Sequence, residues 1–353
     1  MSANLSSSVN RGANMNLKTL LLVALAFVLV APGGVLAQEK VGTTGVNFLK
    51  IGPSSRGVAL ADAFLPMAND ASTLWYNPGG MVNVKSSELI FSHVSFPAQV
   101  NYEYIGYLHP LPSLGAAVGV QLFGLYTDDM IETTPEYPYG TGRTFMASDF
   151  AAGLSYAQSL TDKFSVGSTI KFLQENLADK VARGWSVDVG TYYDTGWRSL
   201  TLAMIISNFG PDMQFISEPF PMPIVFKFGA AANLIDDGTN RLTMALEGIH
   251  PNDNREELHI GFEYGFQEKA FLRVGRKING WKRSTQEEFN DDAENNNPYL
   301  EYPVLDEDGL SWDGLSFGGG VYFPGIGLTV DYAYATYAYL GNIHRFSLLY
   351  SIR

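Results

Sequence analysis

The sequence predicts an all-β protein, a transmembrane antiparallel β-barrel of about fourteen strands with a short N-terminal helical hatch in its lumen. Three observations predict this fold class. Apolar and polar residues alternate over many short segments, the connections between these segments fall into a short set and a long set, and the chain begins with an export leader. Period-two alternation is typical of strands with two different faces. The separation of connection lengths is typical of barrels in bacterial outer membranes.

Residues 1–37 have the features of a cleavable signal peptide. Arg11 and Lys18 are its only charges, an apolar core spans Leu17–Val30, and Val35-Leu36-Ala37 fits a cleavage site. An uncleaved membrane anchor is the alternative interpretation, although the apolar run is short for one. Export predicts the cell outer membrane as the location. The chain has no cysteine, which excludes disulfides, cysteine metal sites and a lipoprotein anchor.

Within residues 86–353, the expected barrel, fourteen segments satisfy the strand pattern between turn residues. The last segment shows it best, because Phe346 and Leu348 share one face while Arg345 and Ser347 share the other. An even number of strands suits an outer-membrane barrel. The predicted strands are 88–95, 102–109, 114–125, 149–159, 164–174, 184–193, 199–207, 224–234, 241–249, 258–266, 270–277, 311–323, 327–337 and 343–353.

The connections between these strands differ in length according to their order. Tight turns rich in Asp, Gly and Pro, such as 110–113 and 324–326, alternate with a set that contains all the long connections, 126–148, 208–223 and 278–310. An outer-membrane barrel has short periplasmic turns and longer extracellular loops. A two-layer β-sandwich with a wet outer face is the alternative fold, but it has no reason to separate its connections in this way.

Residues 38–85, before the first strand, are too long and too helical for a simple periplasmic tail. Two short helices are predicted over 54–63 and 70–75, with Asn69 or Asp70 as the N-cap of the second. A barrel of fourteen strands has more interior than its wall side chains fill. The segment is therefore predicted to plug the lumen.

One face of the predicted strands is apolar and the other is charged. An Arg or Lys that faces lipid at the midplane costs about 2–4 kcal/mol, so the charged face is assigned to the lumen. Glu103 is assigned to the same face, and Tyr102 and Tyr104 to an aromatic girdle at the membrane interface. Arg56 and Asp62 of the hatch are candidates for ion pairs with the wall, or else are solvated. The predicted lumen charges are Lys171, Asp188, Lys227, Glu247, Glu263, Arg273, Asp331 and Arg345.

Residues 57–81, GVALADAFLPMANDASTLWYNPGGM, resemble the N-terminal hatch of the FadL-like outer-membrane barrels, and above all that of the PorV/PorQ family. Members of that family begin with a small-residue helix, an A.DA pattern and an ND.S..W.NP stretch before the first strand. Gly79 stands where many FadL-like hatches have Ala, an exchange expected to matter little. The hatch motif of this chain consists of Arg56, Asp62, Asn69, Asp70, Trp75, Asn77, Pro78 and Gly79.

The resemblance implies two possible functions. PorV-type proteins take part in type IX secretion, so the first expectation is binding of exported cargo or translocon partners at the extracellular loops. FadL-like transport of hydrophobic small molecules across the outer membrane is the alternative. The expected partners are outer-membrane lipid together with secreted cargo proteins and secretion-system subunits, or else a hydrophobic ligand.

Other sites are predicted from loops rather than from catalytic motifs. The sequence has no nucleophile elbow, HExxH, P-loop or EF-hand pattern, so neither an enzyme nor a cofactor is predicted. The net charge of −13 argues against nucleic acid as a partner. The acidic loop 278–310 is either a Ca²⁺ site or a solvated surface. A second loop is predicted to contact a partner or ligand, or to fold back as a lid; it contains Pro219, Phe220, Pro221, Met222 and Pro223.

Overall fold

The computed structural model describes residues 42–279, 314–336 and 342–352. The predicted leader lies outside these residues, and so does the acidic loop apart from its first two residues. Among the described residues, no helix is long and apolar enough to cross a bilayer.

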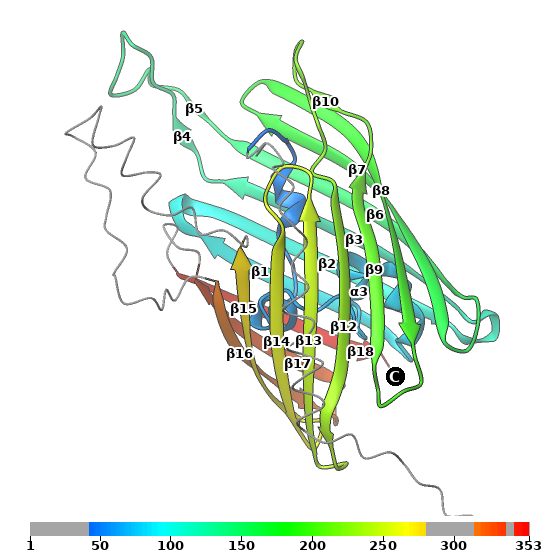
Figure 1. The fold of residues 1–353 in the computed structure, drawn as a ribbon. Helices are drawn as coiled ribbons and strands as arrows, with labels where there is room; N and C mark the ends of the chain where they lie inside the picture. The colour runs from blue at the N-terminus through cyan, green and yellow to red at the C-terminus, as the bar shows by residue number, and fades with distance from the viewer. Residues whose placement is uncertain (1–41, 280–313, 337–341, 353) are drawn as a thin grey trace, which may run out of the picture. The chain divides into compact units, whose positions relative to one another are not determined.

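Fourteen antiparallel strands form a closed barrel, in which β18 pairs with β1 to complete the ring (Figure 1). Each predicted strand corresponds to one of them, with boundaries that differ by at most four residues. The strands are β1 (Ser87–Phe96), β2 (Val100–Leu111), β3 (Ala116–Thr127), β6 (Ala147–Ser159), β7 (Phe164–Leu177), β8 (Lys180–Asp194), β9 (Thr201–Phe209), β12 (Val225–Asp236), β13 (Asn240–Pro251), β14 (Glu257–Phe266), β15 (Ala270–Asn279), β16 (Leu315–Phe323), β17 (Leu328–Thr336) and β18 (Asn342–Ile352).

The described long connections, between β3 and β6 and between β9 and β12, leave one end of the barrel, here called the loop end. The described tight turns leave the other end, here called the turn end (Figure 1). Two small hairpins that the sequence did not predict stand at the loop end. They are β4 (Met130–Ile131) with β5 (Thr144–Phe145), and β10 (Met213–Gln214) with β11 (Pro219–Phe220). Short 3-10 turns, η3 (Pro97–Gln99) and η4 (Pro112–Leu114), complete two of the brief connections.

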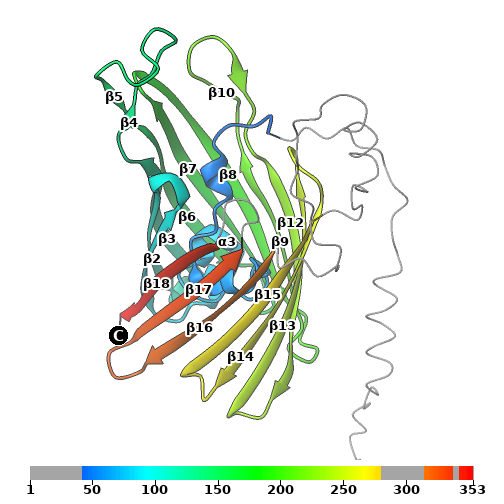
Figure 2. The same ribbon diagram turned by 90° about the vertical axis from the view of Figure 1, so that its left-hand side faces the viewer.

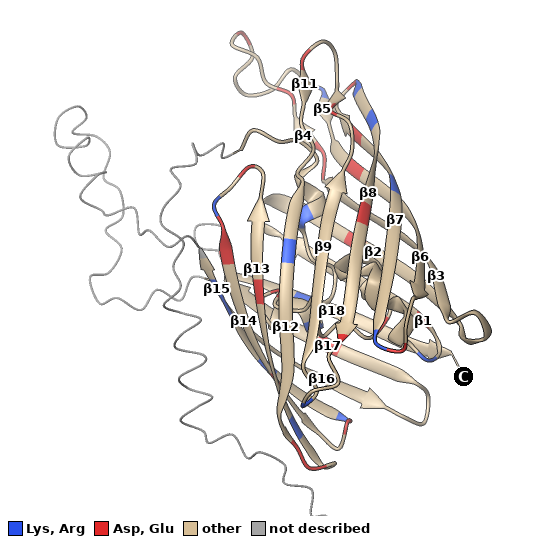
Figure 3. Cartoon of the chain, turned by 45° about the vertical axis from the view of Figure 1, so that its right-hand side comes forward, with Lys and Arg blue, Asp and Glu red and all other residues tan. Residues whose placement is uncertain are grey.

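Burial alternates along the strands as the period-two pattern requires. In β18, for example, Ile343, Arg345 and Ser347 are buried, while Phe346 and Leu348 are exposed on the outer face. Large apolar side chains cover this outer face, as expected for a surface in contact with lipid. Figure 3 marks the charged positions, which are few along the strands.

Two predictions for β2 are wrong. Glu103 lies on the outer face, where its carboxylate is 2.7 Å from Nδ1 of His93. Tyr102 and Tyr104 point into the barrel and are fully buried. Both pack against the ring of Phe123, at centroid distances of 6.3 and 5.9 Å. The inner face is aromatic at this point because it meets the apolar part of the chain that fills the barrel.

Residues 42–86, here called the inner segment, lie within the barrel (Figure 2). They form η1 (Asn47–Lys50), α2 (Ser55–Ala59), α3 (Thr73–Tyr76) and η2 (Pro78–Asn83), so the two predicted helices exist but are shorter than expected. α2 packs on β15 to β18, and η2 packs on β6, β7 and β8. The N-cap of α3 is Ser72 rather than Asn69 or Asp70; the Asp70 carboxylate instead accepts a hydrogen bond of 2.9 Å from the Ser72 N–H.

Candidate functional site in the barrel lumen

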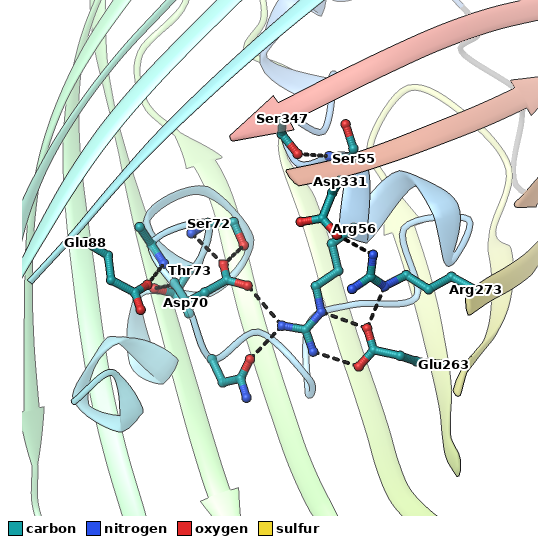
Figure 4. Close-up of polar contacts among 12 residues, drawn as sticks. Ser55, Arg56, Asp70, Ser72, Thr73, Glu88, Glu263, Arg273, Asp331 and Ser347 are labelled. Carbon is teal, nitrogen blue, oxygen red and sulfur yellow. Dashed lines mark hydrogen bonds and ion pairs between the residues drawn. The ribbon is translucent and has the colours of Figure 1, made fainter. Parts of the chain in front are cut away.

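Arg56 of α2 joins the inner segment to the wall of the barrel (Figure 4). Its Nε and Nη2 donate to the two carboxylate oxygens of Glu263 on β14, at 2.8 and 2.9 Å. Its Nη1 donates to Asp70 at 2.9 Å and to Asn69 at 2.7 Å, both within the inner segment. Burial alone would lower the pKa of Arg56, but the carboxylates of Glu263 and Asp70 outweigh it and raise that pKa above its usual value.

The network continues along the wall through Arg273 of β15. Arg273 donates to Glu263 at 2.6 Å and to Asp331 of β17 at 2.5 Å (Figure 4). Two arginines and three carboxylates thus alternate, from Asp70 of the inner segment through α2, β14 and β15 to Asp331 of β17. Buried ion pairs offset their desolvation only with good geometry and further hydrogen bonds, which the bidentate Arg56–Glu263 contact provides.

Asp62 forms a second charged link to the wall. Its carboxylate accepts hydrogen bonds from Lys277 of β15 at 2.6 Å and from the hydroxyl of Tyr76 at 2.9 Å. Burial favours the neutral acid, but the nearby Lys277 ammonium more than offsets this effect and lowers the pKa of Asp62 below its usual value. Arg56 and Asp62 are therefore both paired with the wall rather than solvated.

Carboxylates of the wall also hold the backbone of the inner segment. Glu247 of β13 accepts hydrogen bonds from the N–H groups of Phe64 and Leu65 at 3.1 and 2.9 Å. Glu88 of β1 accepts from Ala71 at 2.8 Å, and Glu175 of β7 from Val46 at 3.0 Å. Because the segment has little regular structure, its buried N–H groups need such external acceptors.

Glycines of the strands provide room for the inner segment. A Cβ atom on Gly275 of β15 would lie 2.1 Å from the carbonyl carbon of Leu60, and one on Gly167 of β7 would lie 2.3 Å from that of Pro78. Such distances are far inside van der Waals contact. The absence of side chains at these positions lets the backbone of the segment lie directly on the sheet.

The Asn77-Pro78-Gly79 motif packs on β7 and β8. Asn77 accepts from the Gly79 N–H at 3.0 Å and donates from Nδ2 to the carbonyl of Thr191 at 3.1 Å. A Cβ on Gly79 would lie 2.8 Å from the carbonyl oxygen of Gly190. The expectation that Ala would serve equally well at position 79 is therefore wrong, because the backbone of β8 occupies the space that a methyl group needs.

A cavity of about 220 Å³ remains between the inner segment and strands β7, β8, β9 and β12 to β15. Leu49, Trp75 and Tyr76 line it from the inner segment. The wall contributes both apolar and charged side chains. They are Lys171, Asp188, Ser207, Asn208, Val225, Lys227, Ile249, Pro251, Glu257, His259 and Lys277. The lining also includes Lys50 and Asn254. Both residues lie at the loop end and are exposed to solvent. The cavity therefore lies near that end of the barrel.

The Pro-rich loop folds back on the inner segment. Met222 is 1% exposed and belongs to the main apolar cluster, and Phe220 packs against the same cluster. The carbonyl of Pro221 accepts from the N–H of Gly45 at 3.2 Å. Pro219 lies in β11 and Pro223 is buried. This is the geometry that the lid interpretation of the loop expects, with Met222 buried and Phe220 partly buried against the inner segment.

All eight predicted lumen charges lie on the inner face. Seven have less than a tenth of their surface exposed, and the Lys227 side chain is 13% exposed. Lys171 pairs with Asp188 at 2.8 Å, and Arg345 donates to the carbonyl of Gly52. The sequence reasoning missed Glu88, Glu175 and Lys277 as contacts of the inner segment. Their inward register on β1, β7 and β15 was the available signal.

Comparisons with known proteins bear on the fold. The structure is similar to that of a Pseudomonas aeruginosa FadL homologue, with a TM-score of 0.51 and 11% sequence identity over 90% of this chain and 100% of that one. The Pseudomonas putida toluene transporter TodX gives a TM-score of 0.49 and 11% identity over 81% of this chain and 95% of that one. No protein-family profile matches the sequence, and no curated protein is similar to it. The first of these two similarities shows that the fold resembles that of the FadL homologue. Nothing in these comparisons bears on the PorV/PorQ resemblance.

Proposed function

We propose that the protein is a plugged outer-membrane channel that passes small hydrophobic molecules. The observation that carries the proposal is the cavity of about 220 Å³ between the inner segment and the wall. Trp75, Leu49, Val225 and Ile249 supply apolar surface there, as is usual for sites that bind small organic molecules. The FadL-like fold and the resemblance of residues 57–81 to a FadL-like hatch support the same function.

The inner segment makes the proposed passage a gated one. Ion pairs of Arg56 and Asp62, hydrogen bonds from wall carboxylates and close contacts with Gly167 and Gly275 all hold the segment in place. A barrel filled in this way is unsuited to steady diffusion of ions. A ligand that enters the cavity would need a local rearrangement of the segment in order to continue.

Uptake by intact cells tests this proposal. The gene is expressed in a Gram-negative host whose own hydrophobic channels are deleted, and entry of radiolabelled toluene is measured. The expected result is faster entry than in the empty host, with no increase for a hydrophilic sugar of similar size. Equal rates of toluene entry with and without the protein would contradict the proposal.

A second candidate function, handling of exported protein cargo, is favoured by the likeness of residues 57–81 to the PorV/PorQ hatch. In that case the loop end of the barrel would bind cargo or translocon subunits. Pull-down of the tagged protein from its native membranes distinguishes the two candidates. Recovery of secreted proteins or secretion-system subunits would support cargo handling, and recovery of neither would count against it.

A further inference from the structure

We propose that residues 44–50, here called the strap, form an outer gate that closes the lumen cavity at the loop end and opens while the rest of the inner segment stays in place. This inference rests on the proposed function, because it names the entrance of the same passage. It follows from the direction in which the chain crosses the barrel, from the contacts of the strap, and from the point at which the wall fixes the chain beneath it.

The inner segment crosses the lumen from the loop end to the turn end. β6 and β12 begin at the loop end after long connections, so their antiparallel neighbours β7 and β13 end there. The strap contacts the end of β7, the connection that follows β13, and the Pro-rich loop. The inner segment then leads into Ser87, where β1 begins at the turn end. A molecule that arrives from the loop end therefore meets the strap first (Figure 2).

The strap has the two faces of a cover. Asn47 and Lys50 are exposed, whereas Phe48 and Leu49 are buried in the main apolar cluster. The Phe48 ring packs on Phe123 of β3 at a centroid distance of 5.7 Å. Leu49 and Lys50 also line the cavity. The short helix η1 thus lies between the cavity and the solvent at the loop end.

The charged contact that closes the strap is weaker than the one that holds α2. Asp253, in the connection after β13, accepts hydrogen bonds from the Thr44 hydroxyl and from the Lys50 ammonium. The Lys50 side chain is 32% exposed, whereas that of Arg56 is 15% exposed and makes a bidentate contact with Glu263. Exposed ion pairs contribute little, and bidentate ones are among the strongest polar contacts. The strap is therefore expected to open before α2 moves.

The closed strap also contains a strained residue. Val46 has φ 54° and ψ 34°, a left-handed conformation that β-branched residues rarely adopt. Its N–H donates to Glu175 of β7 at 3.0 Å, and the N–H of the preceding Gly45 donates to the carbonyl of Pro221 at 3.2 Å. Such strain persists only where surrounding contacts impose it. Opening of the strap would release it.

The wall fixes the chain immediately below the strap. The hydroxyl of Tyr102 donates to the carbonyl of Ile51 at 3.3 Å, and Arg345 donates to the carbonyl of Gly52. Both donors belong to strands of the barrel, β2 and β18. These contacts make residues 51–52 a fixed point about which the strap can swing without displacing α2.

Thiol labelling of the purified full-length protein tests the inference, because the chain has no cysteine of its own. Val225→Cys places a thiol in the cavity lining, and Ala231→Cys places one on the same inner face of β12, nearer the turn end. Asp253→Ala removes the acceptor that Thr44 and Lys50 share. It is expected to make labelling of Val225→Cys by N-ethylmaleimide at least about 5-fold faster, since a hydrogen bond and an ion pair are lost. Labelling of Ala231→Cys should not change.

Asp236→Ala is the matched control, because Asp236 pairs with Arg241 and both are well exposed. It should leave both labelling rates unchanged. Equal labelling of Val225→Cys in the Asp253→Ala and Asp236→Ala backgrounds would overturn the inference. Equal acceleration at both reporter positions would also overturn it, because the whole inner segment would then be loosened. If Asp253→Ala does not fold, as judged by heat-modifiable migration on a gel, Lys50→Gln takes its place in the same comparison.

A cross-link connects the strap to uptake. Thr44→Cys with Asp253→Cys puts two thiols where the side chains now touch, and each single variant is a control that cannot be bridged. A disulfide, or a short bifunctional thiol reagent where the thiols stay free, should stop toluene entry only in the double variant. Reduction of the disulfide should restore entry. Undiminished entry through a cross-linked strap would overturn the outer gate.

The inference and the proposed function can fail separately. Toluene uptake together with labelling that ignores Asp253→Ala would leave the channel standing and reject the gate. Faster labelling of Val225→Cys in Asp253→Ala, with no toluene uptake by any variant, would support the gate and reject the channel.

Discussion

Arg56 and Glu263 join the inner segment to the barrel wall through two parallel hydrogen bonds of 2.8 and 2.9 Å. The two residues are 207 positions apart in the sequence. Glu263 is shared with Arg273, which continues the network to Asp331. This arrangement makes the position of α2 depend on charges supplied by three different strands.

Replacement of Arg56 should loosen the inner segment. Arg56→Met leaves Asp70 buried without its cation and Glu263 with Arg273 alone, and loss of one partner of a buried pair costs about 3–5 kcal/mol. Faster hydrogen exchange of the amides in residues 55–76 is the expected result. Arg241→Met is the control, because Arg241 also pairs with two acids but its side chain is 45% exposed, where such pairs contribute about 0–1 kcal/mol. Equal exchange rates in the two variants would contradict the account.

The Asp62–Lys277 pair predicts a pH dependence with a defined sign. The pKa of Asp62 is lower in the folded protein than its usual value of 3.8. Its stabilising contribution is therefore complete above that value and is lost as the pH falls through the folded pKa. Thermal unfolding of the wild type and of Asp62→Asn should differ most at neutral pH, and the difference should begin to shrink below about pH 4. A difference that grows on acidification would show the opposite sign.

A matched control separates Asp62 from the other carboxylates. Asp179→Asn removes an acid that pairs with Lys180 in an exposed turn, where the Asp179 side chain is 78% exposed. This variant should unfold with nearly the same midpoint as the wild type at every pH. A shift as large as that of Asp62→Asn would mean that the effect is not specific to the buried pair.

A methyl group on Gly275 should displace the inner segment. Its Cβ would lie 2.1 Å from the backbone of Leu60, and overpacking of this kind costs about 1–3 kcal/mol. The measurement is the thermal midpoint of heat-modifiable migration, which should fall in Gly275→Ala. Gly325→Ala is the control, because a Cβ at that turn position meets no atom within 4 Å. Unchanged midpoints in both variants would indicate that the segment does not rest on β15.

The Pro-rich loop should open when its buried anchor is shortened. Met222→Ala removes a side chain that is 1% exposed, and such changes cost about 2–5 kcal/mol. Limited proteolysis should then cut residues 210–224 faster than in the wild type. Ile216→Ala, in the same loop but 70% exposed, should leave the rate unchanged. Faster cutting in the Ile216 variant alone would contradict the lid.

The strands were predictable because the two sides of the barrel wall meet different surroundings. Period-two alternation located all fourteen strands, and the cost of a charge in lipid assigned residues such as Lys171 and Glu247 to the lumen. β2 was misread because Tyr102 and Tyr104 face inward against Phe123. Where both faces of a strand carry aromatic residues, alternation alone does not identify the inner one.

The contacts of the inner segment were only partly predictable. Arg56 and Asp62 stood out as charges in an otherwise apolar stretch, so their pairing with the wall was foreseeable. Their partners, Glu263 and Lys277, depend on the register in which the segment lies on β14 and β15, which is set by close packing on Gly275 and Gly167. The burial of Met222 depends on the same packing, because the Pro-rich loop packs on the inner segment.

Single-channel recording of the wild-type protein in planar bilayers tests most directly the central claim that the inner segment closes the lumen. The account predicts no sustained ion conductance at neutral pH. It also predicts that the double variant Arg56→Met, Asp62→Asn, in which both charged links are removed, shows frequent openings. A steady conductance of the wild type equal to that of the double variant would contradict the claim.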